Sequence, residues 1–155
     1  MNARKKGWVF VIIQFLLIAL VVVLSFYERK LTGRSHNYIT DSLAFLFLSA
    51  GALLFIISII NFGQFVTPNP VPQDDYKLRT NGLYSKVRHP IYLSVIILIT
   101  GYLLFFSAFY TFLIFPLIVL FLHFKMNFEE ENLEKKFPEY ALYKTHTKRL
   151  LPGLY

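Results

Sequence analysis

The chain has 155 residues, of which 55% are apolar and 18% aromatic, and it carries a formal net charge of +7. It contains no cysteine, which excludes disulfide bonds, a thiolate nucleophile and a cysteine-ligated metal. The basic residues stand in short blocks beside long apolar runs, so they predict membrane topology and attraction to anionic membrane lipids, and no binding to nucleic acid.

Two uncharged apolar runs open the chain and predict an all-α integral membrane helical bundle, one domain over residues 1–155. The first run covers residues 8–27 and the second covers residues 43–62. Because about 20 apolar residues span a bilayer core of about 30 Å, each run predicts one transmembrane helix. The first run is too long for a signal-peptide core and lacks a small-residue cleavage site, so we expect it to be retained. Thr40 or Asp41 is expected to cap the second helix.

The prolines between Pro68 and Pro72 cannot continue a helix, so they begin a polar central loop that ends near Arg88. Pro90 suits the first turn of the next helix, where its missing amide is not needed. The apolar run 91–124 is too long for one crossing. We therefore expect two short helices that turn at residues 106–109, which makes four crossings in total.

From Met126 the chain becomes charged and carries an imperfect apolar stripe, which predicts a C-terminal cytoplasmic or interfacial helix. Basic residues gather before the first span, in the central loop and after the last span, whereas the first connection has few. This bias predicts a multi-pass protein with both termini in the cytoplasm.

Two polar clusters stand at the ends of apolar runs, where polar groups are costly without a partner. One is Arg88-His89-Pro90 with Tyr92, and the other is Glu129-Glu130. The predicted topology places both clusters at one cytoplasmic rim. We therefore expect them to face each other across a shared site.

The two clusters resemble the two signatures of the isoprenylcysteine carboxyl methyltransferase family. The first signature is similar to Tyr76-Lys77-Leu78-Arg79-Thr80-Asn81-Gly82-Leu83-Tyr84 with Arg88-His89-Pro90-Ile91-Tyr92, and the second to Glu129-Glu130 with Leu133, Phe137, Tyr140, Tyr143 and Leu151-Pro152. The resemblance covers about residues 63–152. It implies a membrane-embedded methyltransferase, without a Rossmann fold, that uses S-adenosylmethionine and methylates a lipid-like or prenylated acceptor.

The resemblance also implies site residues. Lys125 matches a position where the family has an arginine that handles the substrate carboxylate, a change that keeps the charge and loses the bidentate fork. We expect Arg88, Lys125 and Glu130 to take part in catalysis. The positions implied for cofactor contacts are Tyr76, Lys77, Leu78, Arg79, Tyr84, His89, Pro90, Ile91, Tyr92 and Glu129.

The residue types fit this chemistry. S-adenosylmethionine needs a few fixed charges of both signs within an aromatic, apolar pocket. Arg88 or His89 would bind the carboxylate of S-adenosylmethionine, and Glu129 would bind its ammonium or ribose. Tyr84 and Tyr92 would stack on the adenine or face the sulfonium. A carboxylate acceptor needs no general base, whereas an amine acceptor would first lose a proton to His89 or Glu130. No spacing of histidine and acidic residues predicts a metal site.

Several functions stay open at this point. The leading hypothesis is an isoprenylcysteine carboxyl O-methyltransferase acting at the cytoplasmic membrane face. Phospholipid methyltransferases carry a related pattern, so phospholipid N-methylation is the main alternative. A nicotinamide-dependent sterol-type reductase is disfavoured by the short chain. A small transporter or scaffold is disfavoured because the predicted spans hold no ionisable residue at mid-membrane. The sequence predicts no oligomeric state.

Overall fold

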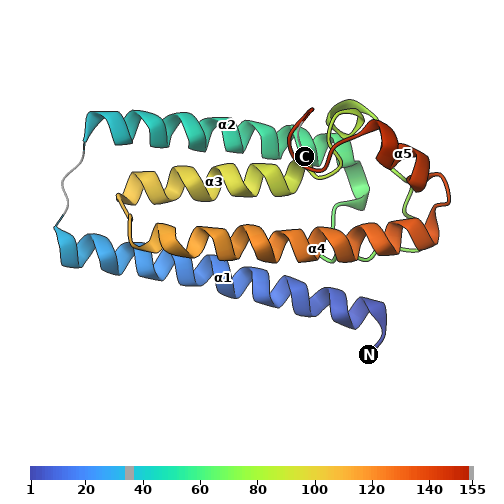
Figure 1. Cartoon of the computed structure of the whole chain (residues 1–155), viewed down its shortest axis with the longest axis horizontal. Helices are drawn as coiled ribbons and strands as arrows, with labels where there is room; N and C mark the ends of the chain where they lie inside the picture. Colours follow the sequence, from blue (N-terminus) through green and yellow to red (C-terminus); the bar gives the residue numbers. More distant parts are fainter. Residues whose placement is uncertain (34–36, 154–155) are drawn as a thin grey trace.

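In the computed structural model, four long helices lie side by side in one bundle (Figure 1). They are α1 (Ala3–Thr32), α2 (Tyr38–Phe62), α3 (Pro90–Phe106) and α4 (Phe115–Lys136). The connections and the tail add η1 (Gly63–Phe65), η2 (Gly82–Ser85), η3 (Thr111–Ile114) and α5 (Tyr140–His146). The structure describes residues 1–33 and 37–153, and in these ranges extended pairing is limited to one isolated β-bridge. The predicted all-α bundle is confirmed.

The two ends of the bundle differ (Figure 1). We call one the turn end, because it carries the C-terminus of α1, the N-terminus of α2 and the turn between α3 and α4. We call the other the loop end, because it carries the N-terminus of α1, the central loop 63–89 and α5. Residues 34–36 of the α1–α2 connection lie outside the described residues.

Within the described ranges, three helical segments are long and apolar enough to cross a membrane, namely Ala3–Thr32, Tyr38–Phe65 and Thr111–Lys136. The chain is therefore a membrane protein. Helix α3 is also apolar but has 17 residues. At 1.5 Å per residue it is about 26 Å long. A fourth crossing by α3, and the cytoplasmic position of both termini, stay predictions.

The structure moves two predicted boundaries. Asn37 caps α2, since its side chain accepts a hydrogen bond from the Ile39 amide at 2.9 Å, whereas Asp41 lies within the first turn. The expected cap at Thr40 or Asp41 was therefore wrong. The charged segment from Met126 continues α4 to Lys136 without a break, because no proline or glycine interrupts it. The C-terminal helix after it is the short α5.

The predicted turn of the apolar hairpin is confirmed. Helix α3 ends at Ser107, whose φ of 52° places it in the left-handed region and reverses the chain. The buried carboxylate of Glu28 in α1 accepts hydrogen bonds from the amides of Tyr110 and Thr111, at 3.0 and 2.8 Å, and from the Thr111 hydroxyl at 2.8 Å. Helix α1 thus ties down the turn between α3 and α4.

Helices α2 and α3 touch through small residues. A Cβ atom on Gly101 would lie 2.8 Å from the backbone nitrogen of Leu48, and one on Gly51 would lie 2.9 Å from Leu98 Cγ. Such close backbone approach stabilises helix pairs in membranes, where no hydrophobic effect drives their association. The tight α2–α3 pair forms the side of the bundle opposite α1 (Figure 1).

Candidate functional site

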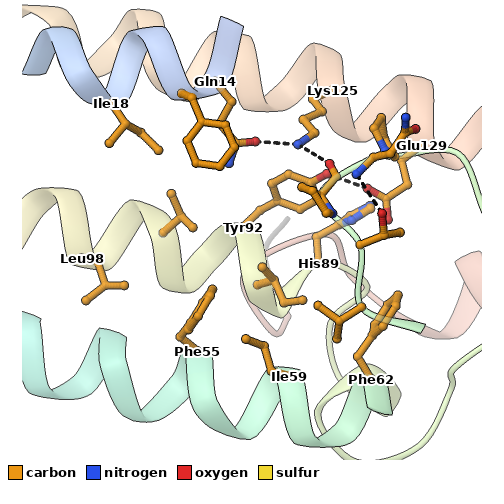
Figure 2. Close-up of a pocket in the computed structure, with 18 of the residues that line it drawn as sticks. Gln14, Ile18, Phe55, Ile59, Phe62, His89, Tyr92, Leu98, Lys125 and Glu129 are labelled. Atoms are coloured by element: carbon orange, nitrogen blue, oxygen red, sulfur yellow. Dashed lines mark hydrogen bonds between the residues drawn. The ribbon is translucent and has the colours of Figure 1, made fainter. Parts of the chain in front are cut away.

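A cavity of about 600 Å³ lies between α1, α2 and α3 and reaches α4 near the loop end (Figure 2). This volume falls within the range of small-molecule sites, about 300–1,000 Å³. Its polar region is lined by Tyr76, Tyr84, Arg88, His89, Tyr92, Lys125 and Glu129. Its apolar region is lined by Ile18, Val22, Leu48, Phe55, Ile59, Val95, Leu98, Ile99 and Tyr102.

Two helices bring the polar side chains together. Pro90 occupies the first turn of α3, so His89 stands at its N-cap and Tyr92 within its first turn. Lys125 and Glu129 are four residues apart on α4 and therefore share one face of that helix. The two polar clusters meet as expected, since the Tyr92 hydroxyl donates a hydrogen bond to Glu129 Oε2 at 2.6 Å (Figure 2).

Lys125 is a buried cation with neutral partners. Its side chain is buried, and Nζ donates hydrogen bonds to Gln14 Oε1 at 2.5 Å and to the Pro68 carbonyl at 3.1 Å. Nζ also lies 5.5 Å from the centroid of the Tyr92 ring. Within the described ranges no carboxylate forms an ion pair with it. An ammonium has three donors, so Lys125 keeps one for an anionic group in the cavity.

An aromatic wall flanks Glu129. The ring of Phe62 lies 5.6 Å from Tyr76 and 5.4 Å from Tyr84, measured between centroids. The Tyr84 hydroxyl is buried and has no hydrogen-bond partner among the described residues. Burial, aided by the charge of Glu129, raises the pKa of Tyr84 well above its ordinary value, so its hydroxyl stays protonated. Aromatic faces, one unused donor and one carboxylate fit a ligand that carries a flat base and a cation.

Glu130, the neighbour of Glu129, is enclosed by basic side chains. Its Oε1 accepts from Arg88 Nε at 2.9 Å and lies 3.0 Å from His89 Nε2, and its Oε2 accepts from Arg149 Nη2 at 2.8 Å. Both carboxylate oxygens are thus engaged by the protein's own side chains. Glu130 does not line the cavity. It lies behind the cavity wall and acts as a tie, in the sense that it links α4 to the start of α3 and to the C-terminal tail.

The C-terminal tail completes this network. The guanidinium of Arg88 donates from Nη1 to the carbonyls of Lys144 and Thr147. The backbone amides of Arg88 and His89 donate to the carbonyls of Lys148 and Arg149, at 2.8 and 3.0 Å. The tail therefore holds the segment before α3 through backbone and side-chain bonds.

The structure brings most of the predicted site residues to one cavity but not all of them. Those on its wall are Tyr76, Tyr84, Arg88, His89, Ile91, Tyr92, Lys125 and Glu129. Lys77 is exposed, and Leu78 packs against the aromatic cluster of Phe65 and Tyr76. The Arg79 guanidinium lies 5.0 Å from the Phe65 ring centroid. Pro90 is buried and, like Glu130, is not part of the wall.

Three residues that contact this region were missed by the sequence prediction. Gln14 is the only amide side chain between Trp8 and Leu24, and this isolation within an apolar run was a usable signal. Asn69 is buried and bonds the Arg4 carbonyl at 3.1 Å. Arg149 carried no local signal, because it lies in the tail after α5 and its partner Glu130 lies in α4, 19 positions earlier.

A family model described as the Isoprenylcysteine carboxyl methyltransferase (ICMT) family matches residues 42–135, more than half of the chain. No curated protein and no solved structure gives a match. The matched range includes most of α2, all of α3, nearly all of α4 and every residue of the polar region. Helix α1 and the tail lie outside it.

Proposed function

This chain belongs to the isoprenylcysteine carboxyl methyltransferase family, and on that premise we propose that it O-methylates a prenylated cysteine or similar lipid-like carboxylate at the cytoplasmic membrane face. The family is one of membrane methyltransferases and implies a prenylated acceptor. The observation that supports the proposal is one cavity in which a buried ammonium and a carboxylate adjoin an apolar region.

The polar region is the proposed site of the methyl donor. S-adenosylmethionine, when bound, supplies a methyl group on a positively charged sulfur. Glu129 would bind a cationic or hydroxyl group of S-adenosylmethionine. The unused hydroxyl of Tyr84 would donate a hydrogen bond to an acceptor atom of the same molecule. The rings of Tyr76 and Tyr92 would provide stacking surfaces, with His89 and Ile91 completing the wall.

Lys125 is the proposed contact for the acceptor carboxylate. A carboxylate is ionised at neutral pH, so it attacks a methyl group without a general base. Lys125 would hold this carboxylate in place through its remaining N–H group. Positioning of this kind accounts for much of the rate acceleration when two reactants must meet. A lysine in place of arginine offers a point charge, so we expect weaker control of the carboxylate's orientation.

The apolar region would hold the acceptor's lipid chain. It follows α3 from Tyr92 to Tyr102, ten residues or about 15 Å of helix. At its far end the Tyr102 hydroxyl donates to the Val22 carbonyl at 3.4 Å and links α3 to α1. Phe55, Ile59 and Leu98 point into the space between these ends (Figure 2). An extended isoprenoid chain matches this shape and polarity.

The other predicted site residues receive supporting roles in this proposal. Arg88 and Glu130 would fix the entrance of α3 and thereby place His89 and Tyr92. Pro90 starts the helix that carries them. Leu78 and Arg79 would support the aromatic wall from behind. The exposed Lys77 would attract the donor's carboxylate from solvent.

The test is methyl transfer by the purified full-length chain. We expect label from S-adenosylmethionine to enter N-acetyl-S-farnesylcysteine as a base-labile ester, with a matched reaction lacking the acceptor as control. Label in a phospholipid headgroup instead would favour phospholipid N-methylation. Absence of both products, together with no calorimetric binding of S-adenosylmethionine, would refute the proposal.

A further inference from the structure

Helix α1 lies outside the family-matched range, yet one of its side chains contacts the proposed site. Gln14 lines the cavity and is half-buried within a helix whose other side chains from Trp8 to Leu24 are apolar. Figure 2 shows it pointing from α1 toward Lys125 on α4. A lone amide in a membrane helix needs a hydrogen-bond partner, and the only side-chain partner recorded for Gln14 in the described structure is Lys125.

The position of Lys125 poses a question of charge. Glu129 follows four residues later on the same helix, and residues so spaced are neighbours that attract when oppositely charged. In the described structure the two side chains do not form an ion pair. Lys125 bonds Gln14 and the Pro68 carbonyl, while Glu129 bonds Tyr92. Neutral groups therefore hold the two charges apart.

We propose that Gln14 is a positioning residue that holds the Lys125 ammonium toward the acceptor carboxylate and away from Glu129. Without the amide oxygen, Lys125 would keep one neutral acceptor and pair with Glu129, as buried opposite charges do in a medium of low dielectric constant. The pair would neutralise both groups. The acceptor carboxylate would then lose its contact with Lys125. S-adenosylmethionine would lose its contact with Glu129.

This inference rests on the proposed function, so the experiment measures two ligands separately. Calorimetry with the purified full-length chain in detergent would give the affinity for S-adenosylmethionine. It would also give the affinities for N-acetyl-S-farnesylcysteine and for its methyl ester, which has the same lipid chain and no carboxylate. The ratio of acid to ester affinity reports on the groups that bind the carboxylate, and the variants at Gln14 and Lys125 show how much of it depends on Lys125.

The wild-type chain is expected to bind the acid about tenfold more tightly than the ester, as a hydrogen bond to a charged group requires. Gln14→Leu should abolish that preference and weaken binding of S-adenosylmethionine several-fold. The double variant Gln14→Leu, Lys125→Met should also lack the preference for the acid over the ester. It should regain affinity for S-adenosylmethionine, because Glu129 no longer has a lysine to pair with. Ile12→Ala, on the lipid-facing side of α1 and 57% exposed, is the matched control and should leave both affinities unchanged.

A purely structural role for Gln14, docking α1 onto α4, makes a different prediction. It would weaken acid and ester equally, and the added Lys125→Met change would not restore donor binding. Either result overturns the inference while the proposed function stands. A wild-type chain that neither binds S-adenosylmethionine nor distinguishes acid from ester would overturn both.

Discussion

Each end of the bundle buries a glutamate, and the two are held in different ways. At the turn end, Glu28 accepts from the backbone amides of Tyr110 and Thr111. At the loop end, Glu130 accepts from the side chains of Arg88 and Arg149. Both carboxylates have their oxygens engaged by the protein, so both act as ties between segments that are distant in sequence.

Glu129 differs from these two ties. Its Oε2 accepts the Tyr92 hydroxyl, and no described group donates to its Oε1. The side chain also lines the cavity, whereas that of the adjacent Glu130 does not. The comparison shows that a buried carboxylate saturated by its own protein stabilises the fold, and that one with a free oxygen beside a cavity is available to a ligand. Four substitutions test this distinction.

The largest effect on stability is expected for Glu130→Ala. Removing the carboxylate takes from Arg88 and Arg149 the buried counter-charge that they share, and such a loss costs about 3–5 kcal/mol. Thermal unfolding in detergent would show a large drop in Tm. Glu131→Ala, on the exposed neighbour, is the control. An unchanged Tm with lost activity would instead make Glu130 a catalytic group.

Glu129→Gln should weaken ligand binding and leave the stability of the fold almost unchanged. The amide keeps the shape and still accepts the Tyr92 hydroxyl, so the Tm should change little. Loss of the charge should weaken binding of S-adenosylmethionine about tenfold or more, since hydrogen bonds to charged groups contribute about 1.5–3 kcal/mol. Calorimetry would measure this. Undiminished affinity would remove Glu129 from the site.

Glu28→Gln is expected to lower stability by about 2 kcal/mol. The neutral amide accepts more weakly from the Tyr110 and Thr111 amides, and its NH2 group cannot accept at all. The affinity for S-adenosylmethionine should equal that of the wild type, because the turn end lies away from the polar region. A parallel loss of binding would show that the two ends are coupled.

The smallest effect is expected for Tyr84→Phe. The hydroxyl has no hydrogen-bond partner in the part of the chain that the structure describes, so its removal should leave the Tm unchanged or raise it slightly. If this hydroxyl donates to the methyl donor, affinity should fall about two- to tenfold, the value of one neutral hydrogen bond. Tyr140→Phe removes another buried hydroxyl that has no partner within residues 1–33 and 37–153 and that lies away from the cavity, so it is the matched control. Equal affinities in both variants would contradict the role of Tyr84.

The sequence by itself determined the membrane bundle, the turn of the hairpin and the two polar clusters. These features depend on local properties, because hydropathy over about 20 residues sets a span and proline sets a helix start. The meeting of Arg88 and His89 with the second cluster also followed, since both clusters end apolar runs at one rim. The continuous α4 departed from the prediction, because charged residues can extend a membrane helix beyond its apolar part.

Only the tertiary structure decided which way neighbouring side chains point. Glu129 and Glu130 are adjacent and identical in type, yet the helical rotation between them turns one into the cavity and the other toward Arg88 and Arg149. The bond from Lys125 to Gln14 joins residues 111 positions apart. Such contacts arise from the packing of whole helices, and no local pattern of residues encodes them.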